Sequence, residues 1–78
     1  MERKLSEVIE GSEVIIKRLE NEPIIKRRLI DMGIVPGKKV KVLSVAPLGD
    51  PIKVDVEGFE VSLRKTEAEI VVIEEVVN

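Results

Sequence analysis

Residues 40–63 read VKVLSVAPLGDPIKVDVEGFEVSL, and three runs of alternating apolar and polar side chains make up most of this stretch. Alternation with a period of two is typical of strands that bury one face. The positions expected on the buried face are Val40, Val42, Val45, Ile52, Val54, Val56, Phe59, Val61 and Leu63. Residues 46–51, with two prolines and one glycine, predict a loop, and Glu57-Gly58 predicts a tight hairpin. The stretch therefore predicts an antiparallel meander of three strands.

The residues near the N-terminus predict one helical turn and one strand. Leu5, Val8 and Ile9 have the spacing of a single helical turn, which Gly11 ends. Residues 13–19 contain three adjacent Val and Ile residues between charged ones, and we expect them to form the first strand.

A short amphipathic helix is expected between this strand and the meander. Pro23 is favoured at the first helical position, and Ile25, Leu29 and Met32 recur at i, i+4 and i+7. Gly33 readily takes the left-handed conformation that ends many helices. The pattern predicts a helix with one apolar stripe.

The C-terminal part predicts a capped turn and a last strand. Thr66 is in a position to cap one short turn, and residues 70–73, IVVI, are apolar throughout, as in a strand buried on both faces. Five short strands with one helix between the first and second fit a mainly β, partly open SH3-like or OB-like barrel. Residues 1–78 are expected to form a single domain, because so short a chain lacks the material for a second core.

The composition excludes most kinds of catalytic or metal site. The chain of 78 residues contains no cysteine, histidine, tryptophan or tyrosine, so it offers no thiol nucleophile, imidazole base or zinc-finger spacing. Most carboxylates fall at the polar positions of the predicted strands, where we expect them to be solvated. We therefore expect no enzymatic activity, no cofactor and no tightly bound iron.

Neither charge nor hydropathy indicates a membrane or a nucleic acid as the partner of the whole molecule. Thirteen basic and fifteen acidic residues give a net charge of −2, so the overall field favours neither. The first residues lack the apolar run of a signal peptide, and no stretch approaches the roughly 18 apolar residues that span a bilayer. The sequence predicts a cytosolic protein without direct membrane insertion.

A locally basic stretch supports one alternative function. It consists of Lys26, Arg27 and Arg28 on the predicted helix and of Lys38, Lys39 and Lys41 beyond it. Small barrels bind nucleic acids with such residues, but single-strand binders add aromatic platforms. The one aromatic residue, Phe59, is expected in the core. Nucleic-acid binding is therefore the less favoured alternative to protein recognition.

Two surfaces are candidates for contact with another protein. The first is the loop of Pro47, Leu48, Gly49 and Asp50. Its prolines stiffen it, and Leu48 is either an apolar tip that enters a partner or a plug that folds back over the barrel end. The second is the basic side of the helix, which consists of Lys26, Arg27 and Arg28. Its competing interpretation is an ordinary solvated helix face.

Three segments together resemble the FeoA family. They are residues 28–37 (RLIDMGIVPG), residues 46–52 (APLGDPI) and residues 58–64 (GFEVSLR), and the resemblance covers roughly residues 5–73. It implies an SH3-like barrel with a helix after the first strand, which the periodicity predicts independently. The chain departs from the family in Phe59, where Tyr is common, and in lacking an extra glycine near Gly11.

The resemblance also implies a role. FeoA-like proteins are cytosolic accessory partners of FeoB, the membrane-embedded ferrous iron transporter with a cytosolic GTPase domain, and the family supplies no agreed catalytic residue. We therefore predict a non-enzymatic accessory protein that binds an FeoB-type transporter. Similar domains form the C-terminal part of iron-dependent repressors, so a regulatory or nucleic-acid-binding barrel is the alternative. A weak homo-oligomer is left open.

Overall fold

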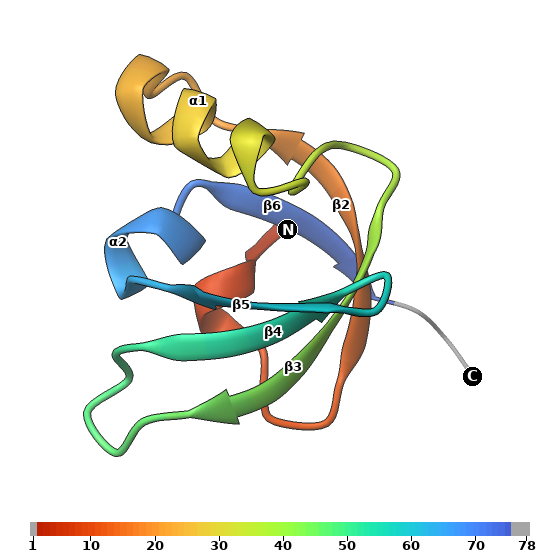
Figure 1. The fold of residues 1–78 in the computed structure, drawn as a ribbon, viewed down its shortest axis with the longest axis vertical. Helices are drawn as coiled ribbons and strands as arrows, with labels where there is room; N and C mark the ends of the chain where they lie inside the picture. Colours follow the sequence, from red (N-terminus) through yellow and green to blue (C-terminus); the bar gives the residue numbers. More distant parts are fainter. Residues whose placement is uncertain (1, 76–78) are drawn as a thin grey trace.

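The computed structural model describes residues 2–75, which form six strands, two α-helices and one short 3-10 helix (Figure 1). In chain order these are β1 (Arg3–Lys4), η1 (Leu5–Glu7), β2 (Glu13–Leu19), α1 (Pro23–Asp31), β3 (Lys39–Val45), β4 (Ile52–Val56), β5 (Phe59–Leu63), α2 (Lys65–Ala68) and β6 (Val71–Glu75). All strands pair antiparallel in one sheet with the order β1-β6-β2-β3-β4-β5. The predicted mainly β fold, with a helix between the first two long strands, is confirmed.

The sheet curls around one apolar core, and the barrel that it forms is partly open. Val42 lies opposite Val54, which lies opposite Val61, and the first two are fully buried. The two edge strands, β1 and β5, are not hydrogen-bonded to each other. Instead, η1, which follows β1, contacts α2, which follows β5. The short helices thus connect the two edges where strand pairing stops.

Helix α1 has the limits and the buried side that its pattern predicts. It begins at Pro23, and Gly33 follows its end with a φ of +87°, a conformation that glycine adopts without strain. Leu29 is fully buried, while Ile25 and Met32 are partly buried against the core. Within residues 2–75, neither this helix nor another is long and apolar enough to cross a bilayer.

Three details of the terminal segments differ from the prediction. Strand β1 was not expected, because its two residues show no alternation and are held in the sheet by their pairing with β6. Ile9 is 73% exposed, since the turn of η1 ends before it. Thr66 does not cap α2: the helix begins at Lys65, and the side chain of Glu67 accepts the N–H of the capping residue, Arg64.

Phe59 is not a core residue, contrary to the prediction. The predicted face of the sheet is correct, because Phe59 pairs with Val56 and lies on the same, inner face. Its side chain is nevertheless 76% exposed. The reason is its place at the hairpin end of an edge strand, where no further strand lies beside it. The sheet therefore ends in an exposed aromatic ring.

Glu2 holds the start of the chain against β2 by its charge. Its carboxylate accepts a hydrogen bond from Arg18 and lies 3.3 Å from Nζ of Lys17. These bonds, that from Arg18 above all, lower the pKa of Glu2 from 4.5 to about 2. The contribution of Glu2 to stability is therefore fully present above pH 4.5 and is lost as the pH falls through 2.

An NMR pH titration of the Glu2 side chain is expected to show the lowered midpoint, and a midpoint near 4.5 would contradict this contact.

Candidate protein-interaction surface

The loop between β3 and β4 presents Leu48 to solvent. The N–H of Ala46 donates to the carbonyl of Pro51 at 3.1 Å, and the N–H of Gly49 donates to the carbonyl of Ala46 at 2.7 Å. Gly49 has a φ of +84°, which lets the chain turn directly after the tip. Leu48 is 92% exposed. The interpretation of Leu48 as a plug of the barrel is therefore wrong, because its side chain points away from the core.

Neighbouring elements hold the base of this loop on both sides. The carboxylate of Asp50 accepts the N–H of Lys65, at the start of α2, at 3.2 Å. On the other side, the carboxylate of Glu10 accepts the N–H of Val45, at the end of β3, at 2.7 Å. Asp50 thus anchors the loop, while Leu48 forms its apolar tip. Such a tip loses little conformational entropy when a partner covers it.

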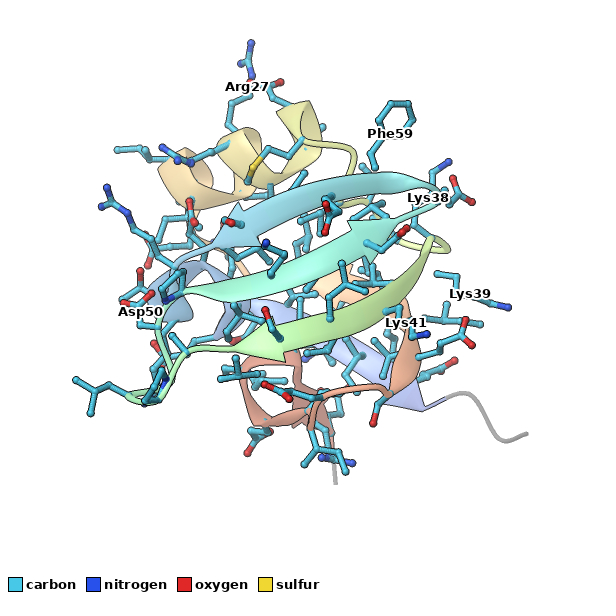
Figure 2. The ribbon with its side chains drawn as sticks, turned by 60° about the horizontal axis from the view of Figure 1, so that its bottom comes forward. Arg27, Lys38, Lys39, Lys41, Asp50 and Phe59 are labelled. Atoms are coloured by element: carbon cyan, nitrogen blue, oxygen red, sulfur yellow. The ribbon has the colours of Figure 1, made fainter. Side chains whose placement is uncertain are left out.

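The basic side of α1 is largely engaged in ion pairs within the chain. Arg27 lies 3.9 Å from Asp31, four residues later on the same helix. Figure 2 shows the side chain of Arg27 pointing away from the body of the protein. Nε of Arg28 lies 2.7 Å from a carboxylate oxygen of Glu67, whose side chain is only 5% exposed. Lys26 is exposed and forms no ion pair within the part of the chain that the structure describes.

Helix α2 lies between the two predicted surfaces and contacts both. At its start it binds Asp50 of the loop, and through Glu67 it binds Arg28 of α1. Glu67 was not singled out by the sequence, where it is one of several exposed-looking carboxylates. The surfaces are therefore parts of one side of the molecule, with a structural ion pair between them.

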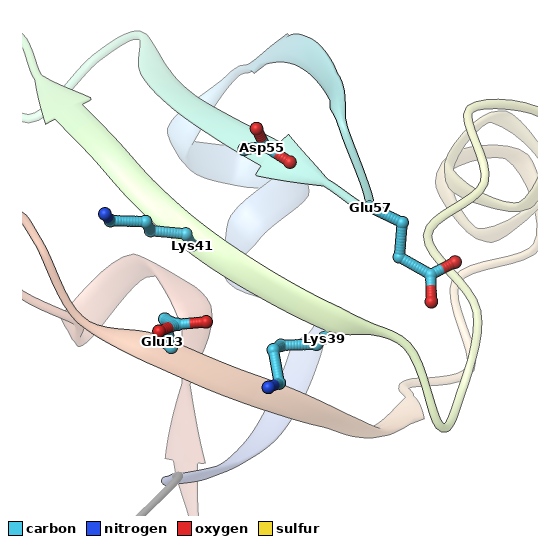
Figure 3. A pocket seen from close by; sticks show the side chains of 5 residues that line it. All are labelled: Glu13, Lys39, Lys41, Asp55 and Glu57. Carbon is cyan, nitrogen blue, oxygen red and sulfur yellow. The ribbon is translucent and has the colours of Figure 1, made fainter. Parts of the chain in front are cut away.

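A hollow of about 450 Å³ over β2, β3 and β4 has a mixed charge (Figure 3). It is lined by Glu13, Lys39, Lys41, Asp55 and Glu57. Lys41 lies between two acids, because its partners across the strands are Glu13 on β2 and Asp55 on β4. Lys38 is bound to Glu57 at 2.7 Å. The lysines of the predicted basic stretch are thus interspersed with acids.

The carboxylates of this face do not form a recognisable metal site. Within residues 2–75, no group of three or more His, Cys, Asp or Glu side chains is arranged to hold a metal ion. The hollow is a surface of solvated charges, which follows from the polar positions of the strands.

A second, smaller hollow lies at the hairpin end of β5. It has a volume of about 260 Å³ and is lined by Met32, Gly33, Lys38, Val56, Glu57 and Phe59. The sequence did not predict it, because the alternation places Phe59 in the core. Figure 2 shows the ring of Phe59 projecting beside the C-terminal end of α1.

The partly open barrel, with its helix between β2 and β3 and its projecting loop, defines the chain as a small SH3-like domain. A solved FeoA of Stenotrophomonas maltophilia in complex with zinc, described as an SH3 domain protein, is 29% identical, has a TM-score of 0.80 and matches 92% of this chain and 89% of its own. The chain belongs to the FeoA domain family, whose model matches residues 3–75.

Two further relatives support this assignment. The solution structure of an FeoA-like protein from Clostridium acetobutylicum has a TM-score of 0.91 at 35% identity and matches 99% of this chain and 90% of its own. A fusion protein of Fe(2+) transport protein A and the Fe(2+) transporter FeoB from Porphyromonas gingivalis is 35% identical over 71 residues, or 91% of this chain. The match spans only 8% of that relative's length.

Proposed function

We propose that this chain is a non-enzymatic accessory protein of ferrous iron uptake that binds the cytosolic part of an FeoB-type transporter. The supporting observation is the relative in which a homologous FeoA part and an FeoB transporter form one polypeptide. Such a link holds two domains at a high effective concentration. Association without such a link needs a surface that holds the two partners together.

The loop tip is the surface best suited to this contact. Leu48 is apolar and 92% exposed, and the hydrogen bonds at the base of the loop fix its conformation before binding. A fixed apolar side chain that enters a pocket is a frequent anchor of protein interfaces. Lys26 and Arg27 on α1 are a second element, which speeds association with an acidic patch.

Leu48→Asp is expected to weaken binding to the transporter's cytosolic domain by roughly tenfold or more, the effect of losing one apolar anchor. Because the side chain is outside the core, Tm should change by no more than about 2–4 °C. Calorimetric titration, with and without guanine nucleotide, measures the affinity.

Phe59→Asp is the matched control, since Phe59 is 76% exposed and lies at the hairpin end of β5, outside both proposed transporter surfaces. It introduces the same charge at another exposed apolar residue and should leave binding unchanged. Equal binding by the wild type and Leu48→Asp would exclude the loop tip, and absence of binding by the wild type would contradict the proposed function.

The geometry gives the nucleic-acid alternative little support. Arg27, Arg28 and Lys38 each face a carboxylate of the same chain. Contacts to phosphates need unpaired cations along one groove. A gel-shift experiment at low salt distinguishes this alternative from binding to the transporter.

A further inference from the structure

The outer edge of β5 has backbone groups that no neighbouring strand uses. β5 is the last strand of the sheet, and a two-residue hairpin, Glu57-Gly58, joins it to β4. In such a hairpin the residues next to the turn exchange hydrogen bonds, and the bonds then alternate along the strand. Residues 59, 61 and 63 therefore bond to β4. Glu60 and Ser62 direct their N–H and C=O groups away from the sheet, and both residues are exposed.

At both ends of this edge the outward backbone groups already form hydrogen bonds within the chain. The N–H of Gly58 donates to the carboxylate of Asp55 at 2.7 Å. At the other end, the N–H of Arg64 donates to the carboxylate of Glu67 at 2.8 Å, and its carbonyl accepts bonds from the first turn of α2. Only Glu60 and Ser62 therefore remain open to a further strand along β5.

Two charges beside this edge lack a counter-charge. Glu60 lies directly opposite Asp55 of β4, and like charges in this position destabilise a sheet. Within residues 2–75, neither Glu60 nor Arg64 forms an ion pair. The edge thus has an unpaired acid near its start and an unpaired base at its end.

We propose that β5 pairs antiparallel with β5 of a second copy of this chain, with Glu60 opposite Ser62 of that copy. In this register the outward N–H and C=O groups of Glu60 and Ser62 are all hydrogen-bonded. Glu60 of each copy exchanges two hydrogen bonds with Ser62 of the other. The register also places Glu60 diagonal to Arg64 of the second copy on one side, within reach of long side chains, and diagonal to Glu60 of the second copy on the other. Two attractions between Glu60 and Arg64 thus outnumber one repulsion between the two Glu60 side chains. Because the axis is two-fold, both unpaired acids meet both unpaired bases.

The neighbouring registers are less favourable. A pair with Glu60 opposite Glu60 places two like charges against each other. A register with Ser62 opposite Ser62 of the second copy would require hydrogen bonds from the N–H and C=O groups of Arg64. Both groups are already hydrogen-bonded to residues of α2. In the proposed register the half-buried Val61 lies opposite Val61 of the second copy. The exposed ring of Phe59 gains a neighbouring strand.

The dimer is weak, because two short strands bury far less than the roughly 1,200 Å² of a stable interface. Sedimentation equilibrium should show dimer forming as the protein concentration approaches roughly 1 mM, the range of such small contacts. Glu60→Arg alone and Arg64→Glu alone each turn both attractions into repulsions. Each variant should dimerise at least about tenfold more weakly than the wild type.

Mixing the two variants is the decisive experiment. In the mixed pair, the arginine introduced at position 60 meets the glutamate introduced at position 64. The native Glu60 of one variant likewise meets the native Arg64 of the other, and the arginine introduced at position 60 is diagonal to that native Glu60. Dimerisation should therefore return at least to the wild-type level. Hydrogen exchange of the amides of residues 60 and 62 should slow as dimer forms, which ion pairing without strand pairing does not cause.

Lys39→Glu on β3 is the matched control. It changes the charge as Arg64→Glu does, at a distance from the edge of β5, and should dimerise like the wild type. The proposal is overturned by a wild type that stays monomeric at roughly 1 mM, by single variants that dimerise as it does, or by a mixture that stays monomeric. Thermal melts establish that each variant is folded. Because the readout is self-association, its outcome is independent of binding to the transporter.

Discussion

Leu29→Ala is expected to lower the free energy of unfolding by about 3 kcal/mol, as large-to-small substitutions in a core do. Leu29 is the one fully buried residue of α1, all of which the structure describes. Its side chain is therefore the main apolar anchor of the helix on the barrel. Urea unfolding followed by circular dichroism measures the change.

Ile30→Ala is the matched control for this experiment. Ile30 is the next residue of the helix and is 43% exposed, so its truncation should change stability by about 1 kcal/mol or less. If both substitutions had the same small effect, α1 would not be anchored by Leu29. In that case the partly buried Ile25 and Met32 would have to hold the helix.

Glu67→Ala is expected to destabilise the protein by about 2 kcal/mol, through the loss of a helix cap and of a charge-assisted bond. One oxygen of this buried carboxylate accepts the N–H of Arg64, and the other contacts Nε of Arg28. The exposed guanidinium of Arg28 is partly screened by solvent, which keeps the effect below that of a fully buried pair. Urea unfolding at neutral pH gives the magnitude.

Glu67→Gln separates the two contributions. Its amide oxygen can still accept one bond but carries no charge, so about half of the loss should remain. A Glu67→Ala variant as stable as the wild type would contradict the role of this ion pair. Arg28→Ala should destabilise for the same reason, and binding data for Arg28 variants therefore need a stability measurement beside them.

The alternation of the sequence predicted most of the sheet, because a period of two directly reflects which side chains face inward. Val42 and Val54 are fully buried as expected. The same pattern wrongly predicted that Phe59 is buried. Alternation indicates which face of the sheet a side chain lies on, but it does not indicate whether another strand lies beside that residue and covers it. The position of β5 at the edge depends on the order of all six strands, which no local pattern contains.

The candidate site was less predictable, because its geometry depends on contacts between distant residues. The composition of the loop indicated stiffness, but it did not distinguish a tip from a plug at Leu48, which is 92% exposed. The position of the loop depends on contacts with distant residues, such as that between Asp50 and Lys65. The ion pair between Arg28 and Glu67 likewise joins two helices that are far apart in the chain. Nothing near either residue in the sequence indicates it.

The position of Phe59 has a practical consequence for spectroscopy. The chain has no tryptophan, tyrosine or histidine, so in D2O, once the N–H protons have exchanged, the aromatic region of its proton NMR spectrum contains the signals of one ring. That ring lies at the surface, next to the outer edge of β5, and it lines the smaller hollow at the hairpin end of this strand. A molecule that binds next to Phe59 is expected to shift these signals. Binding at this site can therefore be followed by NMR without isotope labelling.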